Sequence, residues 1–167
     1  MKNLPWIDEA TAHLGLYEIP GPKTNPTLGL WLHNLKAWWT DDTTPWCGLF
    51  VAHCLQTAKR AIPKEWYRAK AYMGYGTPLK EPAYGCIAVK SRKGGGHVFF
   101  IVGKTASGDL VGLGGNQGNN VCYAKFKRSD IEYFCWPDQL NGSPSFPDST
   151  RYVLPLFNNH LEVVSEA

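Results

Sequence analysis

The sequence lacks the features that mark several common classes of protein. It contains no apolar run long enough to span a bilayer, and its start, MKNLPWIDEATAHLG, includes no apolar core of a secretory signal. It also lacks a run of Lys or Arg and the basic–aromatic repeat of single-strand nucleic-acid binders, although its formal net charge is +3. We therefore expect no stable membrane insertion, no ordinary export signal and no nucleic-acid partner.

Neither a disulfide framework nor a metal motif is indicated. The five cysteines are an odd number without a CxxC pair, and they stand at positions 47, 54, 86, 122 and 135. There is no HExxH motif, and four scattered histidines are expected at the surface or in local hydrogen bonds: His13, His33, His53 and His160. Asp41 and Asp42 come nearest to a calcium site, but calcium takes roughly six to eight oxygen ligands. We therefore expect no metal and no cofactor in the chemistry of this chain.

The sequence contains enough apolar material for one sizeable core, since 44% of its 167 residues are hydrophobic and 13% are aromatic. Apolar residues at helical spacing come first and predict helices over residues 5–16, 27–38 and 45–60. Short β-rich runs follow and predict strands over residues 86–90, 97–102, 110–113, 121–126 and 131–136. This order predicts an α+β fold, with N-terminal helices packed on an antiparallel meander. One domain is expected over residues 5–137, followed by a tail, residues 138–167, of which residues 152–157 are apolar enough to pack back.

Cys47 stands near the start of the third predicted helix. Thr44 is suited to cap that helix and Pro45 to occupy its first position. Cys47 and Cys54 are seven residues apart, so both thiols are expected on the buried side of the helix. The backbone N–H groups and the dipole at a helix start favour the thiolate form of a cysteine. The alternative is that Cys47 is simply a small buried residue.

His97 follows three glycines and opens a predicted central strand, which is apolar on both faces. A histidine there can meet a cysteine at the head of the helix that packs on the sheet, and such a pair is the working unit of a thiol hydrolase. A third group must accept the other imidazole N–H, and Asn116 is placed to do so, with its neighbour Gln117 as the second choice. The alternatives are an ordinary strand end at His97 and a flexible turn at residues 114–120. Residues 112–118 also fit the GxGxxG spacing, but no βαβ unit surrounds them, which argues against a nucleotide site.

Three sequence motifs resemble those of a known family. WCGLFV at residues 46–51, GHVFFIVG at residues 96–103 and LGGNQ at residues 113–117 are similar to the CHAP branch of the papain-like NlpC/P60 peptidoglycan hydrolases, especially a phage-associated subfamily. The segments at residues 5–6 and 15–26 also resemble the start of that subfamily, so the similarity covers residues 5–137. Three positions depart from the family pattern. Gly48 stands where relatives usually have Ser or Ala, Cys86 where they have Asp, and Gly114 where many have Glu.

The resemblance implies a papain-like fold and cleavage of an amide bond in peptidoglycan. It implies Cys47 as nucleophile, His97 as base and Asn116 as the orienting residue, with supporting parts for Gln117, Asp42, Asp41 and Trp46. An oxyanion would be held by the Cys47 N–H and by a donor a few residues upstream. Asp41 and Asp42 are expected to order that loop while Thr43 or Thr44 donates, because an ionised carboxylate cannot donate a hydrogen bond.

The biological setting that follows is a phage endolysin without a separate wall-binding domain. We expect a monomer that waits in the host cytoplasm and acts in the periplasm or cell wall after release. A secreted antibacterial amidase effector shares the same chemistry and stays open. A catalytically inactive wall-binding or virion structural module is the alternative from another class. The sequence leaves open whether an amidase bond or an endopeptidase bond is cut.

Overall fold

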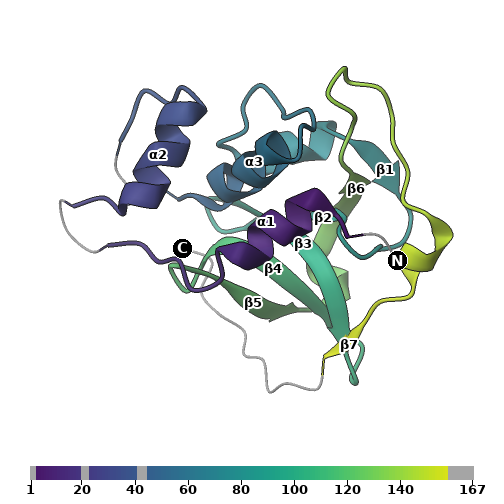
Figure 1. Ribbon diagram of the computed structural model, residues 1–167. Helices are drawn as coiled ribbons and strands as arrows, with labels where there is room; N and C mark the ends of the chain where they lie inside the picture. Colours follow the sequence, from purple (N-terminus) through teal and green to yellow (C-terminus); the bar gives the residue numbers. More distant parts are fainter. Residues whose placement is uncertain (1–2, 20–22, 41–44, 158–167) are drawn as a thin grey trace.

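The computed structural model describes residues 3–19, 23–40 and 45–157 (Figure 1). Within these residues the α-helices are α1 (Pro5–Ala12), α2 (Pro26–Asn34) and α3 (Cys47–Thr57). Short 3-10 helices are η1 (Ala69–Gly74), η2 (Arg128–Asp130) and η3 (Ser149–Tyr152). The strands are β1 (Thr77–Leu79), β2 (Ile87–Arg92), β3 (Gly95–Thr105), β4 (Leu110–Gln117), β5 (Asn120–Phe126), β6 (Ile131–Trp136) and β7 (Leu156–Phe157). Helices precede a largely antiparallel sheet, so the predicted α+β class is confirmed.

Helix α3 begins two residues later than the sequence predicts. The predicted cap, Thr44, lies outside the described residues, and Pro45 precedes the helix instead of opening it. Trp46 is the N-cap residue, with φ −122° and ψ 21°. Its buried indole donates the Nε1–H to Glu18 Oε1 at 3.1 Å, so tertiary packing holds Trp46 outside the helix. Cys47 therefore becomes the first residue of α3.

The far end of α3 is also set by distant contacts. The helix ends at Thr57, three residues before the predicted end, and Lys59 takes a left-handed conformation with φ 58°. The Arg60 guanidinium then lies over the Trp6 ring, 4.8 Å from its centroid, and donates to the Pro137 carbonyl at 3.0 Å. These partners lie far away in the sequence, so the local pattern does not show where the helix stops.

The first two helices differ from the prediction for similar reasons. Helix α1 ends before the predicted residue 16 because the Gly15 N–H donates to the Val121 carbonyl at 2.9 Å. Helix α2 is capped by Asn25 rather than by Thr27, since Asn25 Oδ1 accepts the Thr27 N–H at 2.9 Å. The existence of both helices is as predicted, and their ends are corrected by the structure.

The strands form one sheet in the order β1-β6-β2-β3-β4-β5, with β7 pairing in parallel with β3 off this path. Strands β2 to β5 are successive antiparallel neighbours, as predicted. The expectation that β6 completes the meander is wrong, because β6 pairs with β2, with Cys135 beside Ile87. Residues 87–89 are fully buried, so the backbone groups of β2 need partners on both edges. Strand β6 supplies the hydrogen-bond partners for the second edge of β2.

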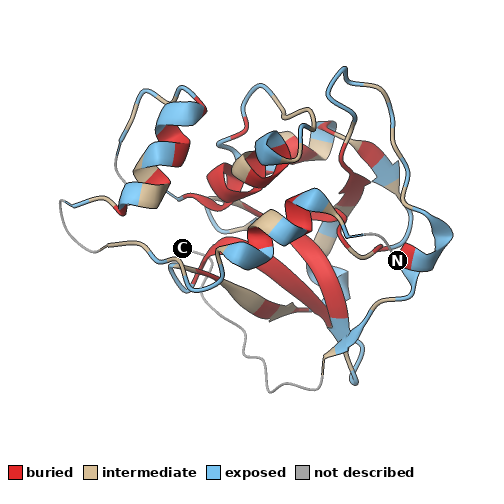
Figure 2. Cartoon of the chain, viewed as in Figure 1, coloured by how far each residue is buried: buried red, intermediate tan, exposed pale blue. Residues whose placement is uncertain are grey.

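Helix α3 packs on one face of the sheet, and α1 packs against α3 (Figure 1). The Phe50 ring of α3 lies 6.3 Å from the Phe100 ring of β3, edge to face. Strand β3 is buried from His97 to Gly103, as predicted for a central strand (Figure 2). Phe99 points to the other face and stacks on Phe126 at 4.1 Å. Burial of each such ring contributes roughly 1.5–3 kcal/mol, so both faces stabilise the sheet.

The described part of the tail, residues 138–157, returns to the domain. Leu156 and Phe157 pair with Lys104 and Thr105 of β3. The Phe157 ring lies so close to Gly103 that a Cβ there would be 2.5 Å from it. Within residues 152–157, Val153 is 78% exposed, so the predicted return of this segment holds only in part.

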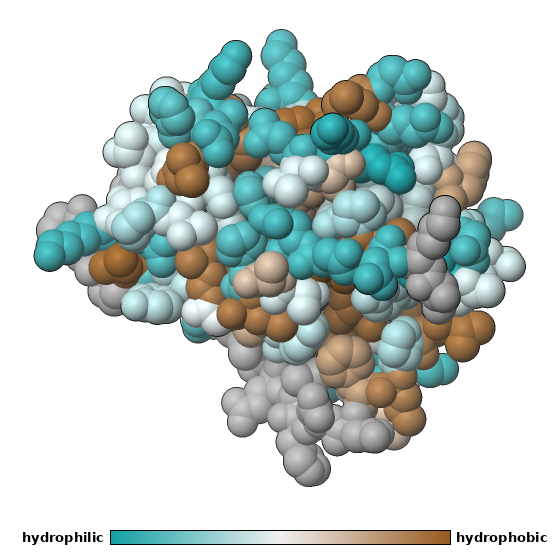
Figure 3. Space-filling model, viewed as in Figure 1, coloured by the Kyte–Doolittle hydropathy of each residue, from teal (hydrophilic) through white to brown (hydrophobic). Residues whose placement is uncertain are grey.

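None of the described helices is long and apolar enough to cross a membrane. On the face drawn in Figure 3, hydrophobic and hydrophilic residues are interspersed.

Candidate functional site

The Cys47 thiol is held by backbone amides at the first turn of α3. Its side chain is 4% exposed. The backbone amide of Val98 in β3 favours the charged form of the sulfur, and the amides of Cys47 itself and of Gly48 act in the same direction. The thiol is therefore placed beside the residue that follows His97. The head of α3 thus lies beside the start of β3, while the His97 ring stacks on Phe99, which points to the face of the sheet away from α3.

Burial has the largest effect on the thiol. It raises the pKa of Cys47 above the ordinary value, and the Val98 N–H, the Arg92 charge and the helix amides offset this increase only in part. The position at a helix start, which favours the thiolate, is therefore not sufficient to lower the pKa of Cys47 in this structure. The helix amides do act in the expected direction, but desolvation of the charged form outweighs them. Cys47 carries its proton at neutral pH and needs a base to lose it.

Cys47 and His97 lie near the point where β3 and β4 separate, and both are buried. The paired residues of these strands run from Phe100–Leu113 to Lys104–Leu110, so the start of β3 extends beyond the ladder. Val98 lies in this extension, where its backbone amide acts on the Cys47 sulfur. On the other strand, the pairing of β4 with β5 shifts between Gly114 and Gln117. We refer to this region as the open end of the β3–β4 pair.

His97 is oriented by Gln117, which was the second choice from the sequence. His97 Nε2 and Gln117 Oε1 are 2.9 Å apart. The Gln117 Nε2 donates to the Cys122 carbonyl at 2.8 Å, and this bond settles which end of the amide faces the histidine. Because Gln117 Oε1 can only accept, His97 Nε2 carries the proton. The Nδ1 of a neutral His97 then has the lone pair of a base.

The space for the Gln117 amide comes from Gly114. A Cβ at position 114 would lie 2.4 Å from Gln117 Oε1. This is the position at which the family pattern has Glu, so a side chain there and the observed Gln117 conformation exclude each other. Asn116, the predicted orienting residue, is 1% exposed and has φ 61°. The structure thus gives the orienting hydrogen bond to Gln117 and leaves Asn116 buried beside it.

The His97 ring is also fixed by aromatic stacking. It lies 5.2 Å from the Phe99 ring and 5.9 Å from the Phe126 ring, at angles of 25° and 27°. A Cβ at Gly112 would come within 2.4 Å of Phe99, so this glycine lets the rings pack against the sheet. These contacts hold the resting imidazole on the face of the sheet that carries Phe99.

Trp46 supports the site as a packing residue. Its indole lies against Gly115, where a Cβ would be 2.8 Å from the ring, and its Nε1–H is used by Glu18. Glu18 also donates its backbone N–H to the Asn119 carbonyl at 2.9 Å, so it joins the β4–β5 turn to the residue before Cys47. This structural role of Glu18 was not predicted from the sequence, although Glu18 lies within residues 15–26, one of the segments that resemble the family.

Three further sets of residues bear on the expectations from the sequence. Arg92, whose charge acts on Cys47, was missed because a single arginine in a hairpin gives no signal. Asp41, Asp42, Thr43 and Thr44 lie outside the described residues. His13 and His53 were expected to be scattered, but the structure brings both to Glu9.

Comparisons of the chain with protein-family models, curated proteins and solved structures gave no match.

Proposed function

We propose that this chain is a cysteine-dependent peptidoglycan hydrolase with a papain-like fold. The observation that supports this most is that the three motif segments, far apart in the sequence, meet at the open end of the β3–β4 pair. Cys47 contacts the amide of Val98, and His97 is bonded to Gln117. A pure wall-binding module has no need for a buried thiol beside the start of a strand that carries a histidine held by an amide acceptor.

In the proposed reaction the Cys47 thiol passes its proton to His97 Nδ1, which requires the imidazole to reach past the start of β3 from the face that it shares with Phe99. The sulfur attacks the carbonyl carbon of a wall-peptide amide, and a C–S bond forms as the carbonyl oxygen takes up negative charge. When the tetrahedral intermediate collapses, the C–N bond breaks and the amine leaves with the proton from the imidazolium. Water, deprotonated by His97, then hydrolyses the thioester and frees Cys47. Gln117 Oε1 stabilises the imidazolium throughout, because it accepts the Nε2–H.

The oxyanion needs hydrogen-bond donors that are in place before the attack. The Cys47 N–H at the head of α3 is one candidate, as the sequence indicates. Trp46 does not supply the second donor, since its Nε1–H already bonds to Glu18. The upstream residues Thr43 and Thr44 remain the proposed source.

The proposed setting is lysis of a bacterial host by a phage endolysin. In this proposal the protein is a monomer that acts on the wall after release from the host cytoplasm. A secreted antibacterial amidase effector would use the same residues. An immunity gene beside the coding gene would identify the effector.

Purified sacculi provide the test. The wild-type chain is expected to release soluble muropeptides, and mass spectrometry of the new ends distinguishes an amidase from an endopeptidase. Cys47→Ala should abolish release and keep the fold, because the nucleophile is lost. Cys54→Ala is the matched control: its thiol is fully buried in the same helix, so we expect full release and a stability loss of about 1 kcal/mol. Release by folded Cys47→Ala would refute the proposal. Binding to sacculi without release by the wild type would favour the inactive wall-binding module.

A further inference from the structure

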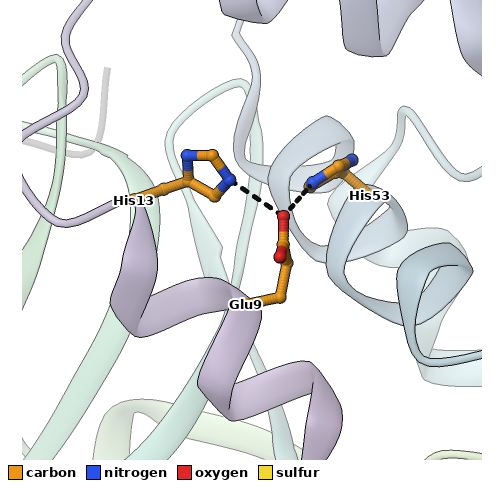
Figure 4. Close-up of side chains that lie close together, drawn as sticks. All are labelled: Glu9, His13 and His53. Atoms are coloured by element: carbon orange, nitrogen blue, oxygen red, sulfur yellow. Dashed lines mark hydrogen bonds and ion pairs between the residues drawn. The ribbon is translucent and has the colours of Figure 1, made fainter.

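Glu9, His13 and His53 form a cluster between α1 and α3 (Figure 4). Glu9 and His13 lie one turn apart on α1 and its C-cap, and His53 comes from α3. Both imidazoles point at one carboxylate oxygen. Glu9 Oε2 lies 2.8 Å from His13 Nε2 and 2.6 Å from His53 Nε2. Two helices are therefore joined through a single oxygen atom.

Aromatic contacts hold the two imidazoles in place. Trp31 of α2 stacks on His53 at 4.1 Å and 11°, and it meets His13 edge to face at 4.9 Å and 84°. The cluster is nevertheless open to solvent, because the side chains of His13, Glu9 and His53 are 27%, 23% and 12% exposed. An ion can reach the cluster from outside, and the rings do not need to be reordered to face it.

The carboxylate is suited to binding a cation. Burial alone would raise the pKa of Glu9, but hydrogen bonds from His53 and His13 outweigh it, so the pKa of this carboxyl lies below its usual value. Glu9 Oε2, at which both imidazoles point, is the oxygen ligand of the set. Each neutral imidazole can free its Nε2 lone pair by moving its proton to Nδ1, without any change of net charge.

We propose that Glu9, His13 and His53 bind one Zn²⁺ ion that ties α1 to α3. The three ligand atoms already lie within 4.8 Å of one another. A tetrahedral zinc ion with bonds of about 2.0–2.1 Å holds its ligand atoms roughly 3.3 Å apart, so shifts of about 1 Å at the ends of the side chains suffice. Water fills the fourth position on the exposed side.

The donor set selects the kind of ion. Two imidazoles and one carboxylate suit zinc and similar transition metals, whereas calcium and magnesium require mostly oxygen ligands. The site is separate from the thiol chemistry, since the proposed reaction at Cys47 uses none of its residues. Its role is to fasten the N-terminal helix to the helix that carries Cys47. This inference does not depend on the proposed hydrolase activity.

Calorimetric titration and thermal unfolding of the chelator-treated full chain with Zn²⁺ test the proposal. We expect one ion per chain, and a rise of the unfolding temperature by roughly 5–10 °C at a zinc concentration about 100-fold above the dissociation constant. Glu9→Gln and His13→Gln should each weaken binding by at least about tenfold and remove most of the temperature shift. His13 is partly exposed, so its variant is expected to fold even if Glu9→Gln does not.

His33→Gln is the matched control, because this histidine is exposed on α2 and lies outside the cluster. It should respond to zinc as the wild type does. Co²⁺ then identifies the ligands: the cluster should give visible d–d bands without the near-ultraviolet charge transfer of a thiolate. An unchanged unfolding temperature of the wild type in zinc would overturn the proposal. A thiolate charge-transfer band, or a wild-type response in folded His13→Gln, would overturn it as well.

Discussion

Gln117 holds His97 through a hydrogen bond whose proton has a defined position. The glutamine amide is fixed at its other end by the Cys122 carbonyl, so its oxygen must face the imidazole. This arrangement supports the tautomer in which Nε2 carries the proton and Nδ1 is the base. A residue beside the expected one therefore takes the orienting role.

Replacing Gln117 should lower turnover more than replacing Asn116. Gln117→Ala removes the acceptor for His97 Nε2, and we expect kcat to fall by about 10²-fold or more, because oriented acid–base catalysis is lost. Asn116→Gly is the matched variant, since glycine tolerates the left-handed backbone at φ 61° while the amide is removed. Steady-state kinetics on soluble wall peptides would measure both. Equal losses in the two variants, with both folded, would mean that Asn116 takes part in the chemistry.

The Cys47 thiol should become reactive only at alkaline pH. Burial raises the pKa of Cys47, so the thiolate fraction in the resting protein increases through and beyond the ordinary range of a cysteine. We expect the rate of iodoacetamide labelling at Cys47, followed by mass spectrometry, to rise steadily up to pH 9 and above. A rate that is already constant at neutral pH would instead indicate a preformed thiolate–imidazolium pair.

At the scale of the elements, the start of α3 depends on a glycine. Gly48 lies against the backbone of Trp66 and Tyr67, and a Cβ there would be 2.5 Å from the Trp66 oxygen. The Tyr72 hydroxyl bonds to the carbonyls of Gly48 and Trp66, at 3.0 and 3.1 Å. This close approach leaves no room for a side chain at position 48. It also fixes the segment after α3 next to the thiol.

Gly48→Ala should therefore destabilise the protein although alanine favours helices. Overpacking of this kind costs about 1–3 kcal/mol, which exceeds the gain of roughly 1 kcal/mol in helix propensity. Urea unfolding measures the difference. Gly74→Ala is the matched control, because nothing lies within 4 Å of its added Cβ, and it should stay within about 0.5 kcal/mol of the wild type. A Gly48→Ala protein as stable as the wild type would show that the Trp66–Tyr67 segment can move aside.

At the scale of the whole molecule, buried thiols make stability depend on pH. Burial raises the pKa of Cys86 to about 12 and that of Cys54 and Cys135 well above the ordinary value. The folded protein then keeps these protons at a pH where the unfolded chain has lost them. Since the unfolded state binds fewer protons, the free energy of unfolding falls as pH rises above about 8.5, the thiol pKa of an unfolded chain.

The decline should amount to about 1.4 kcal/mol per pH unit for each such thiol. Urea unfolding at pH 8, 9.5 and 10.5 would measure the slope. Cys86→Ala should be less stable at pH 8, because a buried side chain is lost. Between pH 9.5 and 10.5, however, its free energy of unfolding should fall less steeply than that of the wild type, by about 1.4 kcal/mol per pH unit, the contribution of one thiol. An identical slope in the variant would mean that Cys86 does not titrate in the unfolded chain as assumed.

The sequence by itself determined the order of helices and strands, the α+β class and the placement of Cys47 and His97 at the heads of a helix and a strand. Hydrophobic periodicity and the residues that favour turns and helix caps act over a few positions, so they can be recognised without a structure. The ends of the helices were predicted less accurately. The contacts that set them, such as Trp46 with Glu18 and Arg60 with Trp6, join residues that are far apart in the sequence.

Only the tertiary structure decided which groups meet. Strand β6 joins β2 rather than β5, Gln117 reaches His97, and His13 and His53 converge on Glu9. Each outcome depends on space and burial supplied by distant residues, such as the room that Gly114 leaves for the Gln117 amide. The protonation of Cys47 was decided in the same way. A helix start favours the thiolate, but desolvation arises only when the surrounding elements close over the sulfur, and it has the larger effect.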